Sequence, residues 1–139
     1  MPKRKQAVVT CMDTRLDPLR MLNAAIGDLH VIRNAGGLVT ADVERSLVIS
    51  QRRLRTTRID VIMHTGCGMN GLDEDALRAE IVAAGAEPPS RFGSFADLEG
   101  ELRRGVALLR SNPVLKNRTQ IRGYVYDVST STLKLLVNE

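Results

Sequence analysis

The sequence "VIMHTGCGMNG" (61–71) joins an apolar run to a glycine-rich turn that carries a histidine and a cysteine. His64 and Cys67 are separated by two residues, a spacing that lets both side chains reach one metal ion. The run that leads into them, "RIDVIMH" (58–64), predicts a strand. A zinc site needs at least three protein ligands, so this stretch predicts a metal site only if another part of the chain supplies a third.

The size and composition of the chain indicate an ordinary globular domain. It has 139 residues, of which 43% are hydrophobic and 26% are charged. A chain of this length buries enough surface to fold without a disulfide or a metal. We therefore expect residues 1–139 to form a single domain. Its core should be aliphatic, because the chain has only two Phe, two Tyr and no Trp.

Charge and hydropathy argue against several kinds of partner. The net charge of +4 comes from scattered basic residues, and the tightest groups are "KRK" (3–5) and "RRLR" (52–55). Such groups are usually solvated, and few aromatic residues are present to stack on bases, so we expect no nucleic-acid partner. We also expect no membrane partner and a cytoplasmic location, because no long apolar run or secretory signal is found. In the cytoplasm, two cysteines suit metal binding or catalysis better than a disulfide.

Short β-branched runs alternate with helical patterns along the chain. Besides 58–64, we expect strands at 7–11, 29–34, 121–128 and 133–137. Capping residues, acidic first turns and apolar periodicity predict helices at 17–26, 40–54, 72–85 and 94–113. The alternation predicts an α/β fold, with a mostly parallel central sheet of about four strands flanked by helices. The segment "STST" before the last strand predicts a hairpin, so that strand should be an antiparallel edge strand.

The predicted topology offers a third ligand. In open parallel sheets, ligands bind outside the carboxyl ends of the strands. Cys11 ends the first predicted strand and His64 ends the third, so the two meet at one edge if those strands are neighbours. Cys11, His64 and Cys67 would then bind zinc and leave its fourth position open, as in catalytic sites. The alternative is that both cysteines are buried as small apolar residues and His64 is a hydrogen-bonded core residue.

Two charged residues follow Cys11 in "CMDTRLDP" (11–18). Asp13 and Arg15 can form a bidentate pair that fixes the orientation of both groups. Beside a metal, Asp13 could accept a hydrogen bond from a bound water, or it could occupy the open position itself. The alternative is a surface ion pair with no chemical role. The second histidine, His30, lies inside a predicted strand, where we expect packing or exposure rather than metal binding.

Together these motifs resemble the β-class carbonic anhydrases. "CMDTR" and "HTGC" are similar to the zinc signature of that family, C-x-D-x-R followed by H-x-x-C. "VIRNAGG" (31–37) and "RSLVISQRRL" (45–54) resemble the segments that lie between the two motifs. "HTGCGM" with the nearby "LDED" is most similar to the compact prokaryotic branch. The resemblance runs from about Val8 to Val137.

The resemblance implies reversible hydration of carbon dioxide to bicarbonate and a proton. One Zn²⁺ per chain would be bound by Cys11, His64 and Cys67, and a zinc-bound hydroxide would be the nucleophile. Asp13 and Arg15 would be the catalytic pair, which leaves a water on zinc in an open state. In a closed state the aspartate would block the metal. The resemblance also implies a homodimer or a dimer of dimers, whose cleft is lined partly by the neighbouring subunit.

The sequence departs from the family pattern in three places. Family members commonly carry an N-terminal helical arm that packs across the partner, whereas about six residues precede the first predicted strand here. The aromatic residues that often line the cleft are scarce, and Gly66 stands where related loops usually carry an acidic or amide residue. No residue is evident that would carry away the proton released by the reaction, and His30 is the one candidate.

Two other functions stay open at this point. One is hydrolysis of carbonyl sulfide or carbon disulfide at the same site, because discrimination among these substrates depends on cleft shape. The other is a non-catalytic, zinc-binding or bicarbonate-sensing protein in which Asp13 is permanently on the metal. Loss of Asp13 or Arg15 would favour the second alternative, and both residues are present.

Overall fold

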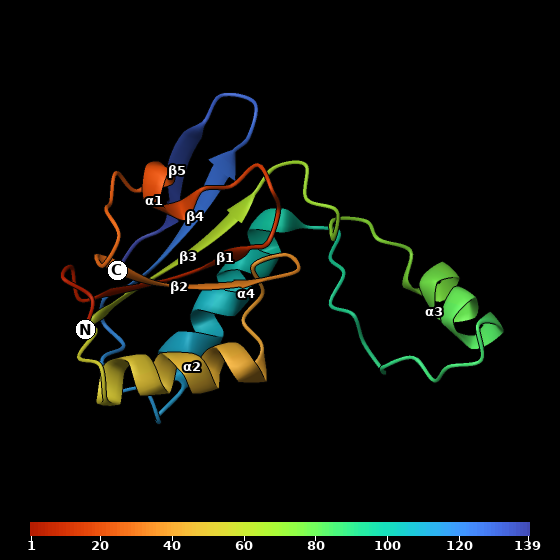
Figure 1. Ribbon diagram of the computed structural model, residues 1–139, viewed down its shortest axis with the longest axis horizontal. Coiled ribbons are helices and arrows are strands. Elements are labelled where there is room, and N and C mark those ends of the chain that lie inside the picture. Colours follow the sequence, from red (N-terminus) through yellow and green to blue (C-terminus); the bar gives the residue numbers. More distant parts are fainter.

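The computed structural model describes residues 1–139 and centres on one five-stranded sheet (Figure 1). Its strands are β1 (Gln6–Cys11), β2 (Leu29–Asn34), β3 (Arg58–His64), β4 (Ile121–Asp127) and β5 (Thr132–Val137). They lie in the order β2-β1-β3-β4-β5, with the first four parallel and β5 antiparallel to β4. The predicted α/β fold, a mostly parallel sheet with one antiparallel edge strand, is confirmed.

Strands β1 and β3 lie side by side inside the sheet and are buried along nearly their whole length. Every residue of β1 is buried, and so is every residue of β3 after Arg58. Such continuous burial is typical of parallel strands that are covered on both faces. The edge strands β2 and β5 contain only partly buried and exposed residues instead. The metal motifs therefore sit at the ends of the two most buried strands.

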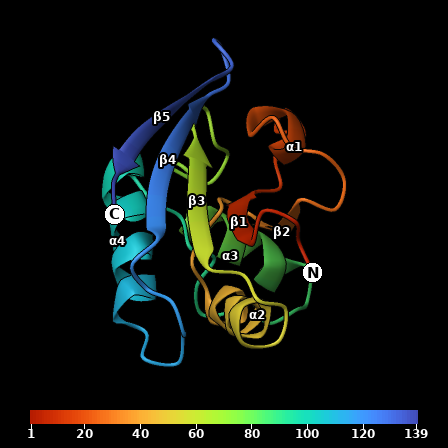
Figure 2. The same cartoon turned by 90° about the vertical axis from the view of Figure 1, so that its left-hand side faces the viewer.

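The helices are α1 (Pro18–Met21), α2 (Ala41–Arg52), α3 (Glu74–Ala83) and α4 (Leu98–Ser111). Helices α2 and α4 pack on one face of the sheet, and α1 lies on the other side (Figure 2). Close packing of α4 needs a glycine in β4, because a Cβ on Gly123 would lie 3.1 Å from side-chain atoms of Leu102 and Val106. No helix has the length and apolar composition that a membrane crossing requires.

The predicted helix at 17–26 is wrong in length, because α1 ends at Met21. Asn23 adopts a left-handed conformation, with φ of 47°. The next N–H, that of Ala24, donates to the carbonyl of Leu19 at 2.8 Å, and the N–H of Asn23 donates to Arg20 at 3.2 Å. This pair of bonds is the Schellman arrangement that closes helices. The apolar periodicity of 17–26 therefore continues past the point where the backbone turns.

One part of the chain stands apart from the sheet. Residues 71–94, here called the projecting segment, follow the loop after β3, form α3 and lead back toward α4 (Figure 1). None of these residues is buried. Helix α3 is also shorter than the predicted 72–85, since the side chain of Asp73 caps it by accepting from the N–H of Ala76.

Candidate metal centre

The structure brings Cys11, His64 and Cys67 together at the carboxyl edge of the sheet. Strands β1 and β3 are parallel neighbours, and Thr10 is in register with Ile62. One ligand atom from each of the three residues lies within 4.8 Å of the other two. The exposed fractions are only 4% for Cys11, 1% for His64 and 7% for Cys67. The cluster is therefore a closely spaced set of donors shielded from bulk water.

The imidazole of His64 is oriented for a ligand. Its Nδ1 lies 2.8 Å from the carbonyl oxygen of Thr65. A carbonyl only accepts hydrogen bonds, so Nδ1 carries the hydrogen and Nε2 presents its lone pair. Nε2 is buried and has no hydrogen-bond partner. Buried polar atoms without partners are rare in folded proteins, and a metal ion between this nitrogen and the thiols would satisfy it.

The two thiols suit the same ion. Both cysteines are free, and the N–H of Gly36 donates to Cys11 Sγ at 3.3 Å. Burial raises the pKa of the Cys67 thiol, and the nearby Cys11 raises it further. The raised pKa favours the protonated thiol, whereas a bound divalent cation would favour the thiolate. Two sulfur ligands and one imidazole fit zinc and leave one of its four positions free.

Asp13 lies beside this cluster, held by Arg15. The guanidinium donates from Nε to Oδ1 at 3.0 Å and from Nη2 to Oδ2 at 2.7 Å, while the Arg15 backbone N–H donates to Oδ1 at 2.8 Å. These hydrogen bonds hold the pKa of Asp13 well below its usual range. Asp13 Oδ2 is 3.8 Å from His64 Nε2. The carboxylate is thus ionised, oriented and close to the unpartnered nitrogen.

Arg15 also connects the two sequence motifs. Its Nη2 donates to the carbonyl oxygen of Gly66 at 3.0 Å, so the loop that carries Cys67 is tied to the loop that carries Asp13. Gly66 has φ of 65°, and a Cβ there would lie 3.6 Å from the Arg15 guanidinium nitrogens. The glycine noted as a departure from the family pattern therefore lies next to the Asp13–Arg15 pair.

Arg33 is a supporting residue to which the sequence reasoning gave no role. Its Nε donates to the carbonyl of Cys11 at 2.9 Å, and its Nη2 donates to the carbonyls of Asp13 at 2.8 Å and Leu16 at 3.2 Å. One side chain from β2 thus fixes the loop that carries both a ligand and the carboxylate. Its place in "VIRNAGG" was the available signal, although nothing in that string reveals three backbone carbonyls as partners.

Gly37 lets a second loop pass close to Cys11. Its φ is 66°, and a Cβ there would lie 3.0 Å from the backbone nitrogen of Cys11 and 3.0 Å from the carbonyl carbon of Thr10. A Cβ that close to backbone atoms, in a left-handed conformation that side chains rarely adopt, would be strained. Asn34 braces the same turn, since its amide exchanges two 2.9 Å hydrogen bonds with the backbone of Leu38.

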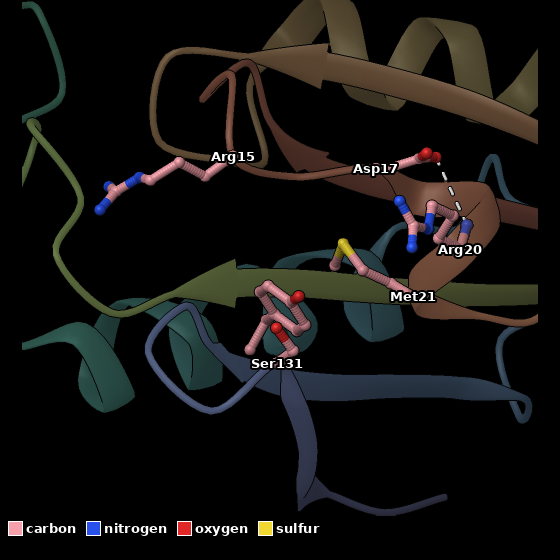
Figure 3. Close-up of a pocket in the computed structure, with 6 residues that line it drawn as sticks. Arg15, Asp17, Arg20, Met21 and Ser131 are labelled. Carbon is pink, nitrogen blue, oxygen red and sulfur yellow. Dashed lines mark hydrogen bonds between the residues drawn. The ribbon is translucent and has the colours of Figure 1, made fainter.

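A cavity of about 390 Å³ adjoins the centre on the α1 side. It is lined by Arg15, Asp17, Arg20, Met21, Tyr126 and Ser131. Figure 3 shows Arg15 reaching away from Asp17 and Arg20, toward the loop that follows β3. None of the three clustered donors lines this cavity, so Arg15 is the side chain that borders both the cavity and the carboxylate.

His30 is not placed to carry protons from the metal centre, so that idea is wrong. It is in register with Ala7, four residues before Cys11 along the neighbouring strand. Its Nδ1 is 2.7 Å from Ser50 Oγ, which is itself 2.7 Å from Thr56 Oγ1. The side chain is thus engaged with α2, away from the carboxyl edge of the sheet.

The chain is similar to known proteins over nearly its whole length. A model of the family described as carbonic anhydrase matches residues 6–85. Beta-carbonic anhydrase 1 of Mycobacterium tuberculosis (strain H37Rv) is 44% identical, over 95% of this chain and 82% of that protein. The crystal structure of a carbonic anhydrase from Streptococcus mutans has a TM-score of 0.91 and 40% identity, over 99% of this chain and 83% of that one. A carbon disulfide hydrolase of Acidianus sp. (strain A1-3) is 30% identical, over 94% of this chain and 76% of that protein.

The matched region 6–85 contains the three clustered donors and the Asp13–Arg15 pair. Sequence, fold and relatives therefore agree, and the resemblance noted in the sequence is confirmed. The chain is an enzyme of the β-carbonic anhydrase family.

Proposed function

We propose that residues 1–139 form one zinc domain that reversibly hydrates carbon dioxide to bicarbonate and a proton. Cys11, His64 and Cys67 would hold the ion, one per chain. The observation that carries this proposal is the buried Nε2 of His64, which has no hydrogen-bond partner and lies among two free thiols. The 44% identity to a β-carbonic anhydrase supports the choice of reaction.

When bound at these ligands, zinc lowers the pKa of water to about 7 and so supplies a nucleophile at neutral pH. Asp13 would accept a hydrogen bond from the attacking oxygen and so orient it toward the substrate carbon. Arg15 keeps that carboxylate ionised and holds it by both oxygens, which limits its motion toward the ligands. Arg33 and Gly37 keep the backbone of Cys11 in place, so the donor positions are set before any ion arrives.

The decisive experiment joins metal analysis of the purified protein to stopped-flow hydration of carbon dioxide between pH 7 and 9. We expect about one zinc per chain and measurable hydration. Activity that appears only at high pH would indicate that Asp13 blocks the ion near neutrality. A zinc-loaded protein without activity at any pH in this range would instead support a sensing or structural role and overturn the proposal.

A second candidate function is the hydrolysis of carbon disulfide or carbonyl sulfide at the same ligands. The 30% identical carbon disulfide hydrolase favours including it. These substrates have the same linear shape and electrophilic carbon as carbon dioxide. Turnover should be compared on all three, with sulfide release measured for the sulfur compounds. Fast sulfide release with negligible carbon dioxide hydration would replace the first proposal.

We also propose that the chain acts as a homodimer or a dimer of dimers in the cytoplasm. Two reduced cysteines as metal ligands fit a reducing compartment. A projecting segment without any buried residue fits an assembly in which a neighbour covers it.

A further inference from the structure

Five basic side chains gather at the edge of the sheet where its parallel strands begin. They come from three segments, which are the residue before β1, the end of α2 with the turn before β3, and the loop between α4 and β4. They are Lys5, Arg52, Arg53, Arg55 and Lys116. Because β1, β3 and β4 are parallel neighbours, these segments meet at one edge, where they line a cavity of about 440 Å³, here called the basic cavity.

The basic cavity lies at the opposite edge of the sheet from the metal centre. Cys11 and His64 end β1 and β3, whereas Lys5 precedes β1. The six residues of β1, at a rise of about 3.3 Å each, put roughly 16 Å of strand between this edge and Cys11. Figure 1 shows the N-terminus at this end of the sheet, away from the arrowheads of β3 and β4. The cavity is therefore separate from the site described above.

Buried polar side chains hold the walls of the basic cavity. Gln51 is 3% exposed, and its amide exchanges hydrogen bonds of 2.8 and 2.9 Å with the backbone of Asn117. Thr56 is 1% exposed, and its Oγ1 lies 2.7 Å from Ser50 Oγ. Both buried side chains line the cavity and join its walls to α2 or to the loop before β4. The cavity is thus a fixed feature of the fold.

Two of the five cations stand on left-handed backbone. The φ angle is 54° at Lys5 and 64° at Arg55. The N–H of Thr57 donates to the carbonyl of Lys5 at 2.8 Å, which joins the two turns. Glycine and asparagine adopt this conformation at a lower cost than long side chains do. The chain therefore carries cationic side chains at two positions where the backbone alone favours other residues.

No carboxylate compensates the charge of the basic cavity. Its lining contains no acidic residue, and none of the five cations takes part in an ion pair. Basic residues at the end of α2 interact favourably with the helix dipole, which explains Arg52 and Arg53 but not the other three. Like charges that line one concave surface concentrate a positive potential there. Such a cavity attracts a ligand with several negative charges.

The lining also indicates which anion. None of the nine lining residues is hydrophobic, so nothing is present to stack on a nucleobase or to bind an apolar tail. Guanidinium and ammonium groups are the usual partners of phosphate oxygens. Five cations exceed the charge of one orthophosphate, which is about −2 at neutral pH. We propose that the basic cavity binds a condensed phosphate, such as pyrophosphate or tripolyphosphate, independently of the proposed reaction.

The test is calorimetric titration of the purified protein with tripolyphosphate and with orthophosphate at one ionic strength. Lys5→Asn with Arg55→Asn removes two cations, and asparagine suits the left-handed backbone at both positions. Arg103→Gln with Lys134→Gln is the matched control, because it removes the same charge from exposed residues outside the cavity. We expect one tripolyphosphate per chain, bound about tenfold more tightly than orthophosphate. The asparagine pair should weaken that binding about tenfold or more, and the control pair should leave it unchanged.

Several results would overturn this inference. They are a wild-type protein that does not bind tripolyphosphate, an asparagine pair that binds it as tightly as the wild type, and equal weakening in the asparagine and control pairs. ATP that binds more tightly than tripolyphosphate, or a single-stranded oligonucleotide that displaces it, would replace the condensed phosphate by a nucleotide or a nucleic acid.

Circular dichroism verifies the folding of each variant. Arg53→Gln with Lys116→Gln gives a second pair from the same cavity if the asparagine pair does not fold, and the same loss of binding is expected. Zinc content and carbon dioxide hydration are recorded in the same samples, and both should be unchanged in the asparagine pair. An active enzyme that binds no tripolyphosphate would reject the basic cavity as a site while leaving the proposed reaction intact.

Discussion

The metal centre and the projecting segment begin within a few residues of each other, yet they are built in opposite ways. At the centre, each donor is buried, and backbone contacts from neighbouring strands fix its loop. In the segment nothing is buried, and two charged side chains hold the shape. The difference indicates that the positions of the donors follow from the packing of the sheet, whereas the segment is held in shape by a few exposed or partly buried polar contacts.

Removing a donor should have the largest effect. Cys67→Ala leaves two ligands, which do not hold zinc, and we expect loss of the metal together with a fall in carbon dioxide hydration of more than about 100-fold. Metal analysis and stopped-flow kinetics measure the two quantities. Full zinc retention would contradict the ligand assignment.

Changing the carboxylate should have a smaller effect on activity and none on metal content. We expect Asp13→Asn to reduce turnover by about 100-fold, because a neutral amide replaces the hydrogen-bond acceptor that Arg15 orients. Zinc should remain at about one per chain. Asp17→Asn is the matched control, since Asp17 caps α1 and lines the neighbouring cavity. An Asp13→Asn enzyme with the wild-type rate would remove Asp13 from the mechanism.

Substitution of Gly37 tests how closely its loop packs against the backbone of β1. Gly37→Ala adds a Cβ at 3.0 Å from the backbone of β1 in a left-handed conformation, and we expect a loss of about 2 kcal/mol or more in the free energy of unfolding. Gly27→Ala is the control, because Gly27 has φ of 93° but no atom within 4 Å of the added carbon. It should cost about 1 kcal/mol from strain alone. If urea unfolding gave the two variants equal losses in the free energy of unfolding, the loop at Gly37 would not be packed tightly against β1.

The smallest effect concerns the segment and acid. The hydroxyl of Ser94, the N–H groups of Phe92 and Ser94, and then Arg78 lower the pKa of Glu74 from its ordinary 4.5 to about 2. Because the folded state favours the carboxylate, this stabilisation is present above pH 4.5 and is lost as the pH falls toward 2. Hydrogen exchange of residues 86–94 should therefore quicken across that interval.

Glu74→Gln separates this titration from general acid effects. The variant should exchange faster than the wild type at pH 7 and show no further change specific to residues 86–94 between pH 4.5 and 2. Amides of β1 and β3 provide the internal reference, because they lie in the buried sheet. A wild-type segment that responds to acid no more than these strands would show that Glu74 does not stabilise it.

The sheet was predictable because its strands are bounded by strong local signals. The predicted strands at 29–34 and 58–64 have the same bounds in the structure, and both end in a polar residue followed by a glycine-containing turn. The meeting of Cys11 with His64 followed from strand order alone, since the carboxyl ends of neighbouring parallel strands share an edge. The early end of α1 could not be predicted, because the apolar periodicity of 17–26 continues past the left-handed Asn23 that ends the helix.

Other features depend on contacts that a sequence pattern does not encode. Arg33 acts through three backbone carbonyls, which any residue would provide, so no side-chain motif marks it. The position of α3 is a similar case. Its caps and acidic first turn are the signals of any amphipathic helix, whether its apolar residues face the core of its own chain or the surface of another.

The projecting segment has a hydrogen-bonded base, where the N–H of Gly71 donates to the carbonyl of Phe95, and this base has an evolutionary and engineering consequence. Since the two ends of the excursion are already side by side, it can be trimmed, lengthened or exchanged without displacing β3 or α4. The length of the excursion could thereby diverge among descendants of one gene while the cluster of Cys11, His64 and Cys67 is kept.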